Sequence, residues 1–476
     1  MPAGPRTFYL IAIGGTAMTP LASLLVEKGE RVLGSDGPLY PPMSDRLAAL
    51  GIEVLPAWNA SNLPPDATRV VVGNLARADN PELREALRRG LPVASMPETL
   101  RAEILAGRHP VVVAGTHGKT TTTALTAWLL ASAGREPGYL VGGEPLNFDA
   151  PARTGRGPAF VVEGDEYSTS YADKGPKFLH YAPRTFVLTS VEFDHADLFP
   201  DLGAVKAAFR RGVAIVPADG RIVAFADDPK VRDVLQGAAA PVTLYSLEDD
   251  KADFFAGGVL ASGDALRFTI RRRGEPFLDA TLPLSGRHNA ANALAAVAVA
   301  LEFGLSPAEI ATGLASFRGV KRRMEVLGSA GGVTVVDDFA HHPTAVASTL
   351  DGAKRRFSGR RIWAAFEPRS MTAGRADFAE PYFEALSTAD AVALAAPFHA
   401  ARLSQPGGPG AFDAGALVAR LRAAGRPAVT ARTPEALLAA LLPELRPGDV
   451  VVSMSSGAFD GFPVKLLAAL AARASR

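Results

Sequence analysis

The feature that most constrains the fold is a strand, loop and helix pattern around residue 115. The run Val111–Val113 is β-branched, a Gly/Thr-rich loop follows it, and Thr120–Leu130 has the composition and spacing of a helix. Such a loop turns its backbone N–H groups and the helix N-terminus toward one point, which suits an anion. The chain is therefore expected to build an α/β unit here, with the strand in a parallel sheet.

The loop itself predicts a site for the phosphates of ATP. Lys119 can reach the terminal phosphates, and the hydroxyl of Thr120 or Thr121 can ligate Mg²⁺. The common pattern has a glycine five residues before Gly118, where this chain has Val113, so the loop is a variant. A turn without a ligand is the alternative. The predicted ATP contacts are Gly115, Thr116, His117, Gly118, Lys119, Thr120 and Thr121.

Length and repeated strand–helix units predict three domains. A chain of 476 residues is long for one core, and the strand–turn–helix pattern restarts after residue 108 and near residue 324. We therefore expect an α/β fold with domains at 1–108, 109–322 and 323–476, on doubly wound sheets that bind ligands at the strands' carboxyl ends. The other expected strands include Thr7–Ile13, Arg31–Gly34, Arg69–Val72, Ala159–Val162, Thr185–Leu188, Val333–Val336, Ile362–Phe366, Ala391–Leu394 and Asp449–Met454.

Composition excludes several classes of function. Lys and Arg number 50 against 49 Asp and Glu, so we expect neither nucleic acid nor a membrane among the partners. The chain has no cysteine, which excludes disulfides, thiol catalysis and cysteine-ligated metals. The N-terminal residues lack the pattern of a signal peptide, and no run of about 18 apolar residues occurs. These features predict a cytoplasmic protein.

Two strands of the central section lead into acidic residues. Glu163–Glu166 follows one strand directly, and Glu192–His195 follows the next. Carboxylates at the carboxyl ends of strands are well placed to hold Mg²⁺ opposite a phosphate loop. Acidic clusters also serve as helix caps or solvated turns, and a lone histidine is often structural. Because both segments reach the same sheet edge, we predict a metal site at that edge, opposite the phosphate loop.

Taken together, these segments resemble the Mur ligases of peptidoglycan metabolism. The phosphate loop, Glu163–Glu166 and Asp194-His195 occur in the family's order with two further motifs, Gly286–Asn292 and Asp337–Thr344. The resemblance covers nearly the whole chain. It implies an N-terminal Rossmann-like domain that binds UDP, a central ATPase domain, and a Rossmann-like C-terminal domain that binds the incoming amine and closes over ATP.

The resemblance also implies roles for individual residues. Without it, the arginine pair 322–323 would be interpreted as a solvated linker, and the histidine pair 341–342 as caps or core residues. The catalytic residues that it implies are Lys119, Glu163 and His195. The residues that it implies around Mg²⁺ are Thr120, Glu163 and His195. The further ATP contacts that it implies are His288, Asn289, Asn292, Arg323, Asp338 and His341.

The glycine turn after the first strand is a candidate UDP site. It lacks the third glycine of a dinucleotide fingerprint, since Pro20 stands near that place, and a plain tight turn is the alternative. A helix N-terminus can still bind a diphosphate, and the resemblance implies that this one binds a UDP-sugar. The predicted contacts are Gly14, Gly15, Thr16, Ala17, Met18, Ser35 and Asp36.

Several segments resemble the branch of the family that adds a peptide, among them Asp173–Phe178 and Glu367–Ser370. That branch uses ATP to join the recycled tripeptide L-Ala-γ-D-Glu-meso-diaminopimelate to UDP-N-acetylmuramate through an acyl phosphate. Ser168 and Met371 depart from its pattern, in which Asp and Asn are usual. Arg369 is the candidate for binding a peptide carboxylate, because arginine offers two parallel donors; a solvated arginine is the alternative.

Three other functions stay open at this point. One is the ligase that adds L-alanine to the same UDP-sugar. Another is a phosphate-loop ATPase or kinase that performs no ligation. The last is a nucleotide-binding regulator without catalysis, although the presence of Lys119, Glu163 and His195 argues against it.

Overall fold

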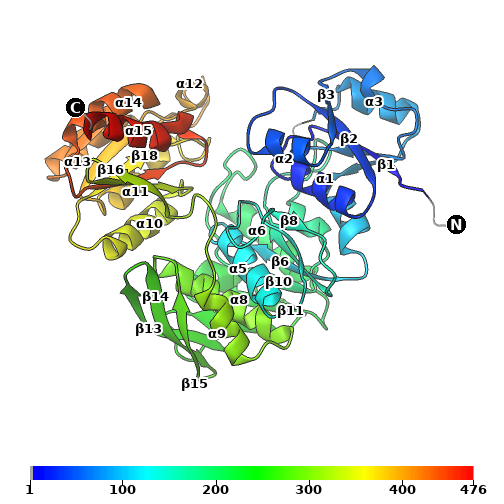
Figure 1. The fold of residues 1–476 in the computed structure, drawn as a ribbon, viewed down its shortest axis with the longest axis horizontal. Helices are drawn as coiled ribbons and strands as arrows, with labels where there is room; N and C mark the ends of the chain where they lie inside the picture. The colour runs from blue at the N-terminus through cyan, green and yellow to red at the C-terminus, as the bar shows by residue number, and fades with distance from the viewer. Residues whose placement is uncertain (1–3, 75, 475–476) are drawn as a thin grey trace.

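The computed structural model describes residues 4–74 and 76–474, which form three β-sheets with helices packed against them (Figure 1). The strands of the three sheets span residues 7–95, 109–282 and 325–454. This architecture confirms the expected α/β fold. The domain boundaries that we propose, after residues 108 and 322, fall between the sheets. In Figure 1 the central domain lies below, with the N- and C-terminal domains above it on either side.

The N-terminal domain has a parallel sheet with the strand order β3-β2-β1-β4-β5. The central strand β1 is buried throughout, and its side chains alternate between two apolar clusters, which explains its continuous apolar sequence. The turn after β1 lies where the strand order reverses, the usual place for a ligand. The strands are β1 (Thr7–Ile11), β2 (Arg31–Asp36), β3 (Glu53–Pro56), β4 (Arg69–Val72) and β5 (Val93–Ser95). The helices are α1 (Met18–Glu27), α2 (Met43–Ala49), α3 (Pro81–Arg88) and α4 (Met96–Leu100).

The central domain carries a mixed sheet with the order β15-β14-β13-β12-β11-β10-β6-β9-β7-β8. Strand β6, which precedes the phosphate loop, lies between β10 and β9 and runs parallel to both. The loop and the acidic segments after β9 and β10 therefore meet at one sheet edge. The strands are β6 (His109–Ala114), β7 (Gly138–Leu140), β8 (Ala152–Arg153), β9 (Ala159–Gly164), β10 (Thr185–Leu188), β11 (Arg221–Phe225), β12 (Val242–Ser246), β13 (Phe254–Ser262), β14 (Ala265–Arg272) and β15 (Glu275–Leu282). The helices are α5 (Lys119–Ser132), α6 (Leu202–Ala214), α7 (Pro229–Val234), α8 (His288–Glu302) and α9 (Pro307–Ala315).

The antiparallel strands β13, β14 and β15 extend this sheet and were not among the expected strands. In β14, buried Leu266, Phe268 and Ile270 alternate with more exposed neighbours, which is the pattern of a half-buried strand. The turn between β13 and β14 reaches the C-terminal domain, where Asp264 forms an ion pair with Arg356, the last residue of α10 (Pro343–Arg356), at 2.6 Å. The extension therefore adds a contact between two domains.

The C-terminal domain has a sheet with the order β16-β17-β21-β18-β19-β20, in which β16 is antiparallel to β17 and the other neighbours are parallel. Its strands are β16 (Glu325–Ala330), β17 (Val333–Asp338), β18 (Ile362–Phe366), β19 (Ala391–Ala395), β20 (Ala428–Ala431) and β21 (Val450–Met454). Its helices are α10 (Pro343–Arg356), α11 (Ala379–Leu386), α12 (Ala400–Leu403), α13 (Ala414–Ala423), α14 (Pro434–Leu441) and α15 (Phe462–Ala474). Across the described ranges of the chain, no helix is both long and apolar enough to span a membrane.

Helix α8 forms the centre of the core on one face of the central sheet. Its alanines are small, which allows the helix to lie close to α5 and to strands of the sheet. The residues from Asn289 to Ala300 are all buried, and Leu294 is fully buried among them. This packing holds the N-terminus of α8 next to the N-terminus of α5, where the phosphate loop ends.

Truncating this core should destabilise the central domain. We expect Leu294→Ala to lower the free energy of unfolding by about 2–5 kcal/mol, because it leaves a cavity between α8 and its neighbours. The matched control is Leu260→Ala in β13, since Leu260 is 67% exposed and its loss should cost less than about 0.5 kcal/mol. Urea unfolding followed by circular dichroism measures both, and equal effects of the two variants would contradict the packing described.

Candidate active site

The phosphate loop between β6 and α5 is packed too tightly for side chains at two of its glycines. Gly115 (φ +132°) and Gly118 (φ +81°) adopt conformations that favour glycine. A Cβ atom at Gly115 would lie 2.2 Å from Oγ1 of Thr189, and one at Gly118 would lie 2.6 Å from Oδ1 of Asn292. Val113, which stands where the common pattern has glycine, is a buried residue of β6. The turn therefore begins after the strand.

The ammonium group of Lys119 lies inside this loop. It donates to the backbone oxygens of Gly115 (2.6 Å) and Thr116 (3.2 Å), and it forms an ion pair with Glu166 (2.9 Å). Burial by itself would lower the pKa of Lys119, but the carboxylates around it, with Glu166 first, outweigh burial and raise the pKa. Lys119 is therefore cationic, as phosphate binding requires.

A second cluster joins the start of α5 to β9 and to the C-terminal domain. The hydroxyl of Thr120 donates to Glu163 (3.0 Å) and accepts from Arg323 (3.2 Å). The other oxygen of Glu163 accepts from the backbone N–H of Gly142 (2.8 Å). Burial raises the pKa of the Glu163 carboxyl. Thr121, the alternative metal ligand, is a buried residue of α5.

His195 is connected to Lys119 through a shared carboxylate. Its Nε2 lies 3.5 Å from Oε1 of Glu166, which also contacts Lys119. Burial would lower the pKa of His195, but Glu166 and Asp194 outweigh it and raise the pKa to about 9. Asp194 in turn lies 3.5 Å from Nε2 of His341, which comes from the C-terminal domain. Asp194 thus links the segment that carries His195 to His341 of the C-terminal domain.

The residues predicted to meet the adenine lie at the start of α8, beside the start of α5. Asn292 accepts from the hydroxyl of Thr122 (3.1 Å) and donates to Asn289 (2.9 Å), so these amides form a chain that leads to the phosphate loop. Asn289 also donates to the backbone oxygen of Ser285 (2.7 Å). His288 is exposed at the N-terminus of α8. The two asparagines are therefore held in place by the helices.

Asp338, also predicted to contact ATP, holds the segment that connects the central domain to the C-terminal domain. It is buried and accepts from the backbone N–H groups of Met324 (2.7 Å) and Ala340 (2.8 Å). Arg323 directly precedes Met324, and its guanidinium carbon lies 5.0 Å from the ring centre of Phe339. Asp338 therefore orients the segment that carries Arg323 toward the central domain.

The predicted UDP site is a turn over Gly14–Met18 at the carboxyl end of β1. The backbone N–H of Gly14 donates to Asp36 (2.7 Å), which joins the turn to the end of β2. Ser35 is fully buried, and its hydroxyl donates to the buried carboxylate of Glu82 (2.5 Å). The side chains of the two neighbouring residues thus have different surroundings, with Asp36 at the turn and Ser35 inside the domain.

Arg369, predicted to bind a peptide carboxylate, follows β18 at the carboxyl edge of the C-terminal sheet. Its guanidinium carbon lies 3.6 Å from the ring centre of Phe398, and its Nη1 lies 3.4 Å from Oε1 of Glu367. Glu367 is buried and also accepts from Ser455 (2.6 Å). The side chain of Arg369 is 32% exposed, so stacking orients a guanidinium that solvent can still reach.

Four residues that contact predicted site residues or join the two domains were not themselves predicted as site residues. Glu166 and Asp194 each contact a predicted site residue, and both belong to the acidic segments whose position after strands was a usable signal. Glu192 and His342 contact each other across the domain boundary (3.2 Å). No local spacing could have paired residues so far apart in the chain.

Comparison with protein families matches three consecutive parts of the chain. Residues 7–108 match the model described as Mur ligase family, catalytic domain. Residues 113–300 match the Mur ligase middle domain, and residues 322–457 match the Mur ligase, glutamate ligase domain. Each matched range covers all or nearly all of one of the three sheets, and the middle match begins within β6.

Two curated relatives are similar over almost the full length. The chain is 37% identical to the UDP-N-acetylmuramate–L-alanyl-gamma-D-glutamyl-meso-2,6-diaminoheptandioate ligase of Escherichia coli over 471 residues, which are 98% of each chain. It is 38% identical to a UDP-N-acetylmuramate–L-alanine ligase of an Anaeromyxobacter species over 469 residues, again 98% of each. Overall identity therefore does not separate these two kinds of ligase.

Solved structures support the same family. A murein peptide ligase from Psychrobacter arcticus is 33% identical, with a TM-score of 0.72 over 98% of this chain and 99% of the other. The UDP-N-acetylmuramate-alanine ligase of Thermotoga maritima shares the fold, with a TM-score of 0.79 at 22% identity over 99% of this chain and all of the other. The chain belongs to the Mur ligase family and is an ATP-dependent ligase that forms an amide bond.

Proposed function

We propose that this ligase joins the tripeptide L-Ala-γ-D-Glu-meso-diaminopimelate to UDP-N-acetylmuramate and that it acts in the cytoplasm. The observation that carries the proposal is that Lys119, Glu163 and His195 converge at the sheet edge where Arg323 of the next domain contacts Thr120. The relatives from E. coli and P. arcticus support the peptide as the second substrate. The relative that adds L-alanine makes free alanine the rival substrate.

The chemistry starts with activation of a carboxylate. The lactyl carboxylate of UDP-N-acetylmuramate is a poor electrophile and must be activated before an amine can attack it. One of its oxygens therefore attacks the γ-phosphorus of ATP, ADP leaves, and an acyl phosphate forms. The amine of the peptide then attacks the acyl carbon, loses its proton, and releases inorganic phosphate. Lys119 stabilises the negative charge of the transferring phosphoryl group, and the N–H groups of the loop hold the neighbouring phosphates.

The donors near Lys119 fit a magnesium ion. Oγ1 of Thr120 and Oε1 of Glu163 lie 3.0 Å apart. Both are hard oxygen ligands, which Mg²⁺ prefers. We propose that they hold the ion together with His195, which follows β10 on the other side of β6. When bound, the ion neutralises charge on the phosphates during transfer.

The remaining predicted residues place the substrates around this centre. Asn289, Asn292 and His288 would contact the adenine, and the turn Gly14–Met18 with Asp36 would contact the diphosphate of the UDP-sugar. Arg323, Asp338 and His341 belong to the C-terminal domain. Its closure over the central domain would keep water away from the acyl phosphate, which water would otherwise hydrolyse.

Assays with either the tripeptide or free L-alanine test directly which amine the enzyme uses. With ATP and UDP-N-acetylmuramate present, we expect ADP release that depends on the tripeptide, and a product whose mass equals both substrates less one water. Free L-alanine should support little turnover. Activity with alanine alone would contradict the proposal, and ADP release without any amine would favour an ATPase or kinase.

Replacement of Lys119 tests the phosphate site. We expect Lys119→Ala to lower turnover by a factor of about 10³ or more, because it removes the charge that stabilises the transferring group. The matched control is Lys251→Ala, since Lys251 is exposed and distant in sequence from the site residues. Circular dichroism should be the same for both variants. Retained turnover in the folded Lys119→Ala protein would refute the assignment.

Replacement of Arg369 tests the peptide site. We expect Arg369→Ala to raise the KM for the tripeptide about 10- to 100-fold, as loss of a charged hydrogen bond implies, and to leave the KM values for ATP and the UDP-sugar unchanged. The control is Arg420→Ala on α13, where Arg420 is paired with Glu380 (2.8 Å). An unchanged KM for the tripeptide would show that Arg369 is a solvated arginine.

A further inference from the structure

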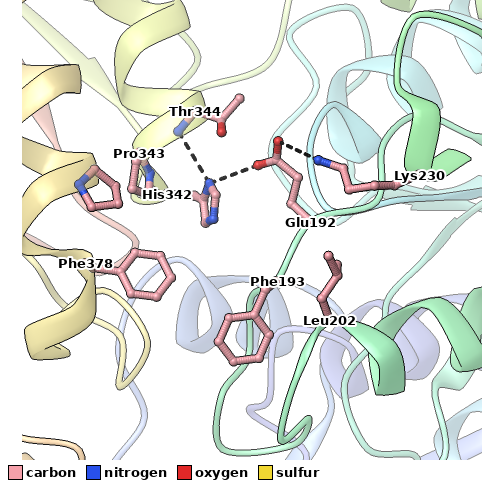
Figure 2. Close-up of a pocket in the computed structure, with 9 residues that line it drawn as sticks. Glu192, Phe193, Leu202, Lys230, His342, Pro343, Thr344 and Phe378 are labelled. Carbon is pink, nitrogen blue, oxygen red and sulfur yellow. Dashed lines mark hydrogen bonds and ion pairs between the residues drawn. The ribbon is translucent and has the colours of Figure 1, made fainter.

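Three potential metal ligands come together outside the proposed magnesium site. Nε2 of His117 lies 3.0 Å from Oε2 of Glu192, and Nδ1 of His342 lies 3.2 Å from the same oxygen. The three ligand atoms all lie within 4.8 Å of one another, and the two imidazole ring centres are 4.9 Å apart. We refer to these residues as the His-Glu-His cluster. Figure 2 shows Glu192 between His342 and Lys230 at the side of a pocket.

The cluster draws one residue from each of three segments. His117 belongs to the phosphate loop, and Glu192 belongs to the segment after β10. His342 is the N-cap residue of α10 and comes from the C-terminal domain. An ion at this point would thus bind the phosphate loop and both domains at once.

The two distances from the imidazole nitrogens to Glu192 fit a small tetrahedral ion. Ligand atoms about 2.0–2.1 Å from Zn²⁺ at tetrahedral angles lie about 3.3 Å from one another. The two contacts to Glu192 are within a few tenths of an ångström of that value. Two imidazoles and one carboxylate form a known ligand set for zinc, which leaves one position open. A pocket of about 290 Å³ beside Glu192 and His342 offers room for a water molecule or another ligand there.

Nδ1 of His342 has two polar neighbours. The backbone N–H of Thr344 lies 3.4 Å from it, and Oε2 of Glu192 lies 3.2 Å from it. An imidazole nitrogen carries either a proton or one lone pair, and in the lone-pair tautomer a metal ion bound to Nδ1 would replace the long contact with Thr344.

Two imidazole nitrogens share one oxygen of Glu192 in this arrangement. His117 can donate from Nε2 to that oxygen, and Lys230 lies 3.6 Å from the other oxygen of the carboxylate. A cation between the three ligand atoms would replace the hydrogen bonds that the imidazoles otherwise make to Glu192. We propose that His117, Glu192 and His342 bind a divalent transition-metal ion of the Zn²⁺ class, which ties the phosphate loop to the C-terminal domain.

Metal binding to the full-length protein tests this proposal without reference to turnover. The protein is stripped of metal with a chelator and titrated with Co²⁺, whose visible absorption bands report nitrogen and oxygen ligands in a low-symmetry site. We expect one equivalent to bind and to be displaced by Zn²⁺. His342→Ala and the isosteric Glu192→Gln should each weaken Co²⁺ binding by at least about tenfold.

The control separates this cluster from the proposed magnesium site. His195→Ala removes a ligand of that other site and should leave the Co²⁺ bands and affinity unchanged. If His342→Ala does not fold, as judged by circular dichroism, Glu192→Gln decides the outcome alone. Absence of Co²⁺ bands in the wild type would overturn the proposal. So would equal Co²⁺ affinity in the wild type and Glu192→Gln, or a loss of binding only in His195→Ala.

Discussion

The balance of charge around Lys119 is the constraint on which the rest of the site depends. An ammonium group can leave water only if a partner compensates for it, and here Glu166 lies 2.9 Å away. The same carboxylate contacts His195, which follows a different strand. A phosphate that binds Lys119 would take over part of this compensation. The phosphate loop and His195 are thus coupled through one carboxylate, so phosphate binding in the loop would change the electrostatic environment of His195.

The parallel sheet makes this coupling possible. Because β6 lies between β9 and β10 and runs parallel to both, the phosphate loop and the two acidic segments reach one edge of the sheet. The C-terminal domain then adds groups from outside the sheet, with Arg323 on Thr120 and His341 near Asp194. A site divided in this way is complete only when the domains are close together, which suits a reaction that must protect an acyl phosphate from water.

Much of the fold could be predicted because buried parallel strands are continuous apolar runs. The strands Arg69–Val72, Thr185–Leu188 and Ile362–Phe366 have the expected bounds. The meander after β12 was missed, since its strands are half-exposed and a glycine-containing bulge interrupts β13. The phosphate loop and the acidic strand ends were predictable because each follows a continuous apolar strand in the sequence. The contact of Glu192 with His342 was not, because it depends on how two domains dock.

The most direct test of the account follows oxygen atoms through the reaction. UDP-N-acetylmuramate is labelled with ¹⁸O in both oxygens of its lactyl carboxylate and converted with ATP and the tripeptide, and the released inorganic phosphate is analysed by mass spectrometry. If the carboxylate is phosphorylated at the loop that holds Lys119, each phosphate formed by ligation carries one ¹⁸O atom and the amide keeps the other. Release of unlabelled phosphate would mean that the γ-phosphoryl group is transferred to water, and it would contradict the account.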